Sequence, residues 1–279
     1  MPLSPSETTA ILNRLGHLPK KKLGQNFLID GNIVEKSLQL ANLPPSGEVV
    51  EIGPGLGTLT RKLLEAGQTV HAVEIDHRLA ENLETTAIEE IKAGNLFITR
   101  GDAVKKPLGS LPLSSSIYHV VANLPYAISS AWLESVLSTE NLPKRMVLMM
   151  QREAVDRIWA KPGSKEYHAL SIFISNSYQL TEKHAVSRQC FFPSPAVDST
   201  LLRMDLSESA FLFSDKSRNL IRKIFTQRRK QLGSIAKKED PATGSLILEW
   251  LNVIGHPTCE RAEKIEPKKW QYLAKMLEN

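Results

Sequence analysis

Two spacings of apolar residues alternate along roughly the first 200 positions. Short Val- and Ile-rich runs predict buried strands, and stretches with apolar residues at helical spacing predict helices between them. Strands are predicted near 50–52 and at 70–75, 97–100, 117–122 and 145–151; helices are predicted at 6–15, 30–40, 58–67, 77–92, 129–138, 153–159 and 168–175. This order predicts an α/β fold with a mostly parallel sheet, closed by an antiparallel hairpin from 179–187 and 199–205.

The pattern changes near Leu206, after which only helical spacing is found, at about 215–227, 244–254 and 267–278. We therefore expect two domains. Residues 1–206 form an α/β domain, in which residues 1–45 are a capping lead-in to the first strand. Residues 207–279 form a small all-α domain.

The first predicted strand ends in a glycine-rich turn, with Gly53, Gly55 and Gly57 at every second position. A strand that turns through glycines into a helix exposes backbone N–H groups and the positive helix end to a ligand. Glu74 lies 21 positions after Gly53, at the end of the next strand. A carboxylate at about this distance binds a ribose in Rossmann-like folds.

Two nucleotide classes compete for this turn. A dinucleotide site needs G-x-G-x-x-G, but the third glycine position is occupied by Thr58. The observed G-x-G-x-G, preceded by Glu51, resembles the first motif of S-adenosylmethionine-dependent methyltransferases. An ordinary strand–glycine–helix turn is the structural alternative, and Glu74 at its expected distance argues against it.

Polar groups also follow two later strands, where ligands bind in open parallel sheets. Asp102 can accept a hydrogen bond from an adenine amine, although a solvated turn explains it equally well on local grounds. The Asn123-Leu124-Pro125-Tyr126 stretch is more specific. Pro125 keeps Leu124 extended, so the Asn123 side-chain oxygen and the Leu124 carbonyl can both accept from one amine, while Tyr126 stacks on the base.

Composition indicates which class of partner and which cellular compartment to expect. Among 279 residues the net charge is +5 and the pI about 9.1, which suits a polyanionic partner. Cys190 and Cys259 form neither a metal-ligand pattern nor a disulfide framework. No apolar run reaches the length of a membrane span, and the N-terminus lacks a secretory pattern. We expect a cytoplasmic protein without metal or membrane association.

Together these stretches resemble the ribosomal RNA adenine N6,N6-dimethyltransferases, and most closely their small-subunit branch associated with kasugamycin sensitivity. The resemblance runs from about Lys20 almost to the C-terminus. Ala196 departs from it, since many relatives carry lysine there. The matching stretches are Gln25-Asn26-Phe27-Leu28, Glu51 to Gly57, Val73-Glu74-Ile75-Asp76, Gly101-Asp102-Ala103, Asn123-Leu124-Pro125-Tyr126, Phe191 to Ser199 with its Phe-x-Pro-x-Pro pattern, and Phe225 to Lys230.

The resemblance implies S-adenosylmethionine as methyl donor and S-adenosylhomocysteine as product. Its methionine end is placed near Gln25, Asn26 and Gly53, and its ribose on Glu74. Its adenine is placed on Asp102 and Ile75, and Leu28 and Asn123 also contact the cofactor. The catalytic set is Asn123, the Leu124 carbonyl, Tyr126 and Phe191, the last closing on a flipped-out base opposite Tyr126. Phe192 is then either a core residue or a second aromatic without a role in the site. Catalysis is expected by direct displacement, with no strong base.

The implied substrate is a pair of adjacent adenines in a hairpin loop near the 3′ end of small-subunit (16S) ribosomal RNA, each methylated twice within an assembly intermediate. Phosphate contacts are expected from Lys20, Lys21, Lys22, Arg222, Arg228, Arg229 and Lys230, although a solvated helix face explains some of these charges. A monomer is expected.

Four alternatives remain open. They are a large-subunit RNA adenine dimethyltransferase of the antibiotic-resistance type, a DNA adenine methyltransferase, a noncatalytic ribosome-assembly or RNA-binding factor, and a distant NAD-dependent oxidoreductase. No extra target-recognition domain supports the DNA enzyme. Thr58 and the Asn123 stretch disfavour the oxidoreductase.

Overall fold

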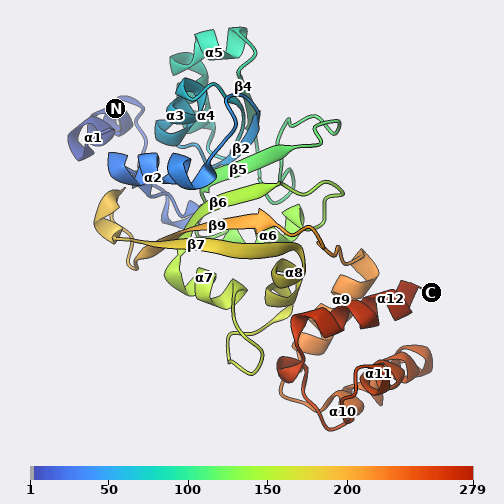
Figure 1. Ribbon diagram of the computed structural model, residues 1–279. Coiled ribbons are helices and arrows are strands. Elements are labelled where there is room, and N and C mark those ends of the chain that lie inside the picture. The colour runs from blue at the N-terminus through green and yellow to red at the C-terminus, as the bar shows by residue number, and fades with distance from the viewer. Residues whose placement is uncertain (1–2, 279) are drawn as a thin grey trace. The chain divides into compact units, whose positions relative to one another are not determined.

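The computed structural model describes residues 3–278 and contains a seven-stranded sheet (Figure 1). The strand order is β4-β3-β2-β5-β6-β9-β7. The first five strands of this order pair in parallel, and β9 runs antiparallel to β6. This confirms the predicted fold class. The strands are β2 (Glu48–Ile52), β3 (Thr69–Glu74), β4 (Leu96–Arg100), β5 (Tyr118–Asn123), β6 (Arg145–Gln151), β7 (Tyr178–Val186) and β9 (Ser199–Leu206).

Helices connect the parallel strands by crossovers. Because such crossovers are right-handed, α3 and α4 lie on one face of the sheet and α6 lies on the other. Helix α2 packs against α3 and begins at Asp30, whose side chain accepts hydrogen bonds from the first turn. The helices of this part are α2 (Gly31–Ala41), α3 (Thr58–Glu65), α4 (His77–Thr86), α5 (Ile88–Lys92) and α6 (Ser129–Val136).

The single helix predicted over 77–92 is wrong, because the chain breaks between α4 and α5 at Ala87. Thr85 and Thr86 precede the break, and their hydroxyls donate to the carbonyls of Glu81 and Asn82. Such back-bonding weakens a helix, as does branching at Cβ. Ala87 is buried against the core, with a backbone outside the helical region.

The first helix, α1 (Pro5–Arg14), begins earlier than predicted. Ser4, not Ser6, is its N-cap, and Ser4 forms a capping box with Glu7. Pro5 occupies the first helical turn, where its missing N–H costs no hydrogen bond. The pattern of Ser4, Pro5 and Glu7 contained this start signal.

A second, two-stranded sheet was not predicted. Strand β1 (Phe27–Leu28) pairs antiparallel with β8 (Phe191–Phe192), so that Phe27 lies opposite Phe192 and Leu28 opposite Phe191. The short 3₁₀ helices η1 (Lys21–Leu23) and η2 (Arg188–Cys190) precede these strands. This pairing fixes Phe27 and Leu28 of the capping lead-in, and both residues line the pocket described below.

The chain divides into two compact units: residues up to 154 with 180–206, and residues 155–179 with 207–279. Helix α7 (Arg152–Ile158) spans the first boundary. The domain limits predicted at 206 and 207 stay a prediction, but residues 155–179 group with the C-terminal helices. Within the second unit, the ring centroids of Trp250 and Trp270 lie 4.8 Å apart. The helices of this unit are α8 (Ala169–Ser177), α9 (Asp215–Phe225), α10 (Leu232–Ala236), α11 (Pro241–Val253), η3 (Ala262–Lys264), η4 (Pro267–Lys269) and α12 (Trp270–Glu278). Within residues 3–278, every helix is too short or too polar to traverse a bilayer.

Candidate active site

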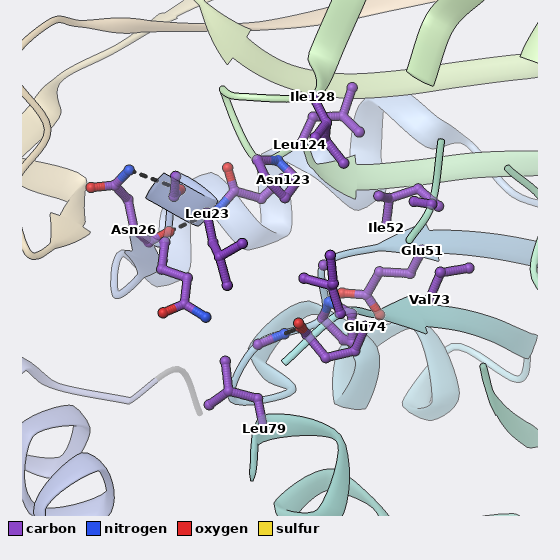
Figure 2. Close-up of a pocket in the computed structure, with 18 of the residues that line it drawn as sticks. Leu23, Asn26, Glu51, Ile52, Val73, Glu74, Leu79, Asn123, Leu124 and Ile128 are labelled. Carbon is purple, nitrogen blue, oxygen red and sulfur yellow. Dashed lines mark hydrogen bonds between the residues drawn. The ribbon is translucent and has the colours of Figure 1, made fainter. Parts of the chain in front are cut away.

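A single pocket gathers most of the predicted site residues at the carboxyl ends of β2, β3 and β5 (Figure 2). The capping segment 22–28 forms the opposite wall. The predicted residues that line it are Lys22, Gln25, Asn26, Leu28, Gly53, Glu74, Ile75, Asp102, Asn123, Leu124 and Tyr126. Residues from five separated stretches of the sequence therefore meet at one place.

The glycine turn forms one wall from bare backbone. Gly53 has φ +67°, and a Cβ atom there would lie 3.0 Å from Cγ of Pro125. Gly55 has φ +58°, and its Cβ would lie 3.1 Å from the ring of Phe27. A side chain at either position would be strained in its backbone and would press on the opposite wall.

Glu74 is anchored within the pocket by backbone donors. Its side chain is buried, and Gly55 N donates to Oε2 at 3.1 Å while Asp76 N donates to Oε1 at 2.8 Å. Burial raises the pKa of Glu74, and these backbone hydrogen bonds partly oppose that rise. Figure 2 shows the carboxylate facing the pocket from the end of β3.

Glu51 is a second buried acid in the pocket lining. It is 1% exposed, and its Oε2 has no hydrogen-bond partner among residues 3–278. Burial raises the pKa of Glu51 to about 8, with the charge of Glu74 adding to the effect. An unpartnered buried carboxyl oxygen suits a ligand that carries a donor or a positive charge.

Asp102 and Ile75 supply one polar and one apolar contact. Asp102 Oδ1 accepts from Val104 N at 2.8 Å, which fixes the carboxylate in its turn. Ile75 lines the pocket and is 47% exposed, an unusual exposure for so large an apolar side chain. An aromatic base lying on Ile75 would cover this apolar surface.

Asn123 has its amide orientation set by the capping segment. Nδ2 donates to the Asn26 backbone carbonyl at 3.1 Å (Figure 2). Because a carbonyl has no proton to donate, the atom that contacts it must be the amide nitrogen, and Oδ1 is therefore left as an acceptor. Leu124 N donates to Met149 O at 3.1 Å, which ties the following residue to β6.

Phe191 does not lie where it was predicted. It is 2% exposed and belongs to the core cluster that includes Leu28 and Leu201. Phe192 is half-buried and packs on the cluster of Leu12, Phe27, Leu56 and Leu79. Neither ring lines the pocket. Pairing of β8 with β1 directs Phe191 into the core, so in this structure Phe191 cannot stack on a base opposite Tyr126.

Gln25 and Lys20 have partners within the protein that were not predicted. Gln25 Oε1 accepts from Lys20 N at 2.7 Å and from His17 at 3.1 Å, and its Nε2 donates to Asp76 at 3.3 Å. Gln25 also lines the pocket, so its place beside the cofactor stays a prediction. Lys20 Nζ lies 2.7 Å from Asp76 Oδ2, so its charge is paired within the protein. Lys21 and Lys22 are exposed.

The predicted phosphate contacts of the helical unit fall into two groups. Arg222 lies over the Phe173 ring at 5.7 Å, and Arg228 donates to the carbonyls of Lys165 and Tyr167. Both therefore have internal roles that were not predicted. Arg229 and Lys230 are exposed, and the charge of Lys238 lowers the pKa of Lys230. Like charges held together at a surface favour an anionic partner.

Two residues that hydrogen bond to lining residues of the pocket, Asp76 and Ser199, were given no role by the sequence analysis. Asp76 stood in a matching stretch immediately before a predicted helix, which is the position of an N-cap. Ser199 ended the Phe-x-Pro-x-Pro stretch, and it hydrogen bonds to the Tyr126 hydroxyl. A capping signal was present for Asp76, whereas no local signal marks the contact of Ser199.

Comparison with known proteins gives consistent results. The family described as ribosomal RNA adenine dimethylase matches residues 16–243. A protein of Opitutus terrae called ribosomal RNA small subunit methyltransferase A is 46% identical over 274 residues, which cover 98% of both chains. The crystal structure of a dimethyladenosine transferase from Plasmodium falciparum superposes with a TM-score of 0.69, at 27% identity over 88% of this chain and 94% of that one. The 23S rRNA methyltransferase ErmE shares the fold, with a TM-score of 0.60 at 21% identity over 91% of this chain and 100% of that one.

Proposed function

The chain belongs to the ribosomal RNA adenine dimethylase family, and on this basis we propose that it dimethylates two adjacent adenines near the 3′ end of small-subunit (16S) ribosomal RNA. The observation that supports this proposal most directly is that two groups of residues share one pocket. They are Asn123, Leu124 and Tyr126 on the one hand, and Gly53 and Glu74 on the other. The first group can accept hydrogen bonds from an aromatic amine and stack on its ring. The second group can bind the nucleoside part of the cofactor. The protein acts with S-adenosylmethionine as donor and releases S-adenosylhomocysteine.

The residues of the pocket fit this donor. Glu74 would hold the ribose hydroxyls, and Asp102 with Ile75 would hold the adenine. The bare backbone at Gly53, with Asn26 and Leu28 opposite, would hold the methionine part. The buried, unpartnered Oε2 of Glu51 lies in the same lining and suits a cationic ligand. When bound, S-adenosylmethionine supplies an electrophilic methyl group on a positively charged sulfur.

The chain itself contributes orientation. Asn123 Oδ1 and the Leu124 carbonyl accept the two N6 protons of adenine, which directs the nitrogen lone pair towards the donor side of the pocket. Tyr126 supports the base by stacking. For the second methylation one of these hydrogen bonds is lost, and the remaining acceptor holds the monomethylated amine. Holding the amine in this geometry, rather than strong base catalysis, lowers the barrier.

We further propose that the helical part, 207–279, contacts RNA phosphates through Arg229 and Lys230, with Lys21 and Lys22 contributing from the capping lead-in. Such contacts position a folded RNA without reading its sequence, while specificity comes from RNA shape and splayed loop bases. The substrate is a small-subunit assembly intermediate, and the protein acts as a monomer in the cytoplasm.

The large-subunit alternative shares the pocket but not the RNA. Small and large ribosomal subunits, prepared from cells that lack this gene, are each incubated with the protein and donor labelled in the methyl group. Label in adjacent dimethyladenosines of small-subunit RNA, identified by mass spectrometry, supports the proposal. Label in large-subunit RNA alone, or in neither RNA, contradicts it.

A further inference from the structure

The capping segment is tied to the cofactor side of the pocket by a buried acid outside the predicted site. Asp76 is 3% exposed and lies two residues after Glu74. Its Oδ2 accepts from Lys20 Nζ at 2.7 Å and from Gln25 Nε2 at 3.3 Å. His17 Nδ1 lies 3.8 Å from Oδ1. Three side chains of the lead-in therefore converge on one carboxylate.

The orientation of the Gln25 amide follows from its partners. Its Oε1 meets the Lys20 backbone N–H, which can only donate, so this atom must be oxygen. The nitrogen then faces Asp76, which as a carboxylate can only accept. Both ends of the amide are satisfied in a single arrangement, which makes the 20–25 turn a defined structure rather than a loose loop.

Asp76 is also connected to the residues that face the ligand. Its backbone N–H donates to Glu74 Oε1 at 2.8 Å, which orients the proposed ribose-binding carboxylate. On the other side, Gln25 precedes Asn26, whose carbonyl accepts from Asn123 Nδ2 at 3.1 Å. One short chain of contacts thus runs from Glu74 through Asp76 and the capping segment to Asn123.

We propose that Asp76 is a positioning residue, which through Lys20 and Gln25 holds the capping segment over the pocket and so sets the cofactor affinity of the site. The inference rests on the proposed function, because it takes the pocket to be the S-adenosylmethionine site. It assigns Lys20 to cofactor binding rather than to RNA. A charge-assisted hydrogen bond contributes more than a neutral one, and Lys20 is the charged partner.

Variants of the full-length protein test the proposal. In the wild type Arg78 N donates to Asp76 Oδ1 at 3.1 Å, which caps the start of α4. Asp76→Asn retains a side-chain oxygen that can accept this hydrogen bond, so the cap is preserved. Its new NH₂ group faces the donors of Lys20 and Gln25, and the contact is broken. Lys20→Met removes the charge at a side chain that is 46% exposed, with little risk to folding. Lys21→Met is the matched control at an exposed neighbour.

The readouts are the dissociation constant of S-adenosylhomocysteine by calorimetry and the steady-state constants of methyl transfer. Asp76→Asn and Lys20→Met should each weaken S-adenosylhomocysteine binding and raise KM for the donor about tenfold. The double variant should bind S-adenosylhomocysteine no more weakly than the more impaired single variant, because both substitutions remove the same contact. At saturating donor kcat should recover to within about threefold. Lys20→Arg should restore binding. Lys21→Met is compared by calorimetry alone, because Lys21 is a proposed RNA contact, and it should leave S-adenosylhomocysteine binding unchanged.

Unchanged S-adenosylhomocysteine binding in Asp76→Asn and Lys20→Met overturns the proposal, as does a loss of RNA affinity alone in Lys20→Met. Equal loss of kcat at saturating donor would indicate a general structural role and also overturn it. Calorimetry requires neither RNA nor turnover. A wild-type protein that binds S-adenosylhomocysteine but methylates neither subunit would therefore refute the proposed function, while the binding comparison still decides the role of Asp76.

Discussion

The hydroxyl groups of Tyr126 and Ser199 hydrogen bond to each other, which joins the end of β5 to the start of β9. Ser199 is 1% exposed, and Tyr126 lines the pocket. Pro125 restricts the backbone on one side of Tyr126, and Ser199 holds the hydroxyl at the far end of its ring. Burial raises the pKa of Tyr126, which keeps the phenol neutral. The plane of the ring is thus set before any base arrives.

Removal of this hydrogen bond should impair methyl transfer without loss of the cofactor. Ser199→Ala and Tyr126→Phe each leave one buried hydroxyl unpaired, so each should lower kcat/KM for RNA about tenfold, which is about 1.4 kcal/mol. The double variant leaves no hydroxyl group of this pair unpaired, so its kcat/KM for RNA should be no lower than that of either single variant. Ser194→Ala, which alters an exposed serine of the same stretch, is the control. Wild-type kcat/KM in both single variants would refute the positioning of Tyr126 by Ser199.

Asn123 should be essential for transfer but not for cofactor binding. Asn123→Ala removes the acceptor for the amine, and loss of such a preorganised group should lower single-turnover methyl transfer by about 100-fold or more. Asn123→Asp keeps an acceptor but loses the donor to the Asn26 carbonyl, so it should also be impaired. S-adenosylhomocysteine binding should stay measurable in both variants. Unchanged single-turnover transfer in Asn123→Ala would exclude the proposed role.

The sequence predicted the elements whose signals are local. The Val-rich strands, the Gly53 turn and the Asn123 stretch each carry their own pattern, and parallel pairing brings their carboxyl ends together. Phe191 and Phe192 were different, because adjacent strand residues face opposite sides and only the partner strand decides which side is core. That partner, β1, is two residues long and lies more than 160 positions earlier. The ion pair of Lys20 was not predicted for a similar reason, since its partner Asp76 lies 56 positions later.

Bare backbone at Gly53 should be required both for stability and for cofactor binding. Gly53→Ala imposes a side chain at φ +67° against Pro125, and the left-handed backbone alone costs about 1–2 kcal/mol. Gly94→Ala is the matched control, because φ is +76° there and nothing lies within 4 Å of the added Cβ. Both variants should lower Tm, but only Gly53→Ala should weaken S-adenosylhomocysteine binding. Equal binding by the two variants would contradict the assignment of this turn to the cofactor.

Glu51→Gln should change how stability depends on pH. The pKa of Glu51 is about 8 in the folded protein, against 4.5 for an ordinary glutamate. Between these values the folded state binds more protons than the unfolded state, so the contribution of Glu51 to stability falls as pH rises from about 5 to 8. Gln cannot titrate, so the stability of the variant relative to the wild type should rise by about 4 kcal/mol as pH goes from about 5 to 8. Subtraction of the two unfolding curves cancels the groups that do not interact with Glu51, and parallel pH profiles would contradict the burial of this carboxyl group.

The two groups of basic residues in the helical unit should respond differently to neutralisation. Arg229→Gln with Lys230→Gln removes two exposed charges, so the affinity for small subunits should fall and the slope of log K against log salt should shrink by about 1.4–1.8. Tm should hardly change. Arg222→Gln removes a guanidinium that lies over Phe173, so Tm should fall while the salt slope stays that of the wild type. Filter binding across a salt series and thermal unfolding measure both. A reduced slope in Arg222→Gln, or a wild-type slope in the double variant, would reverse the assignment of these charges.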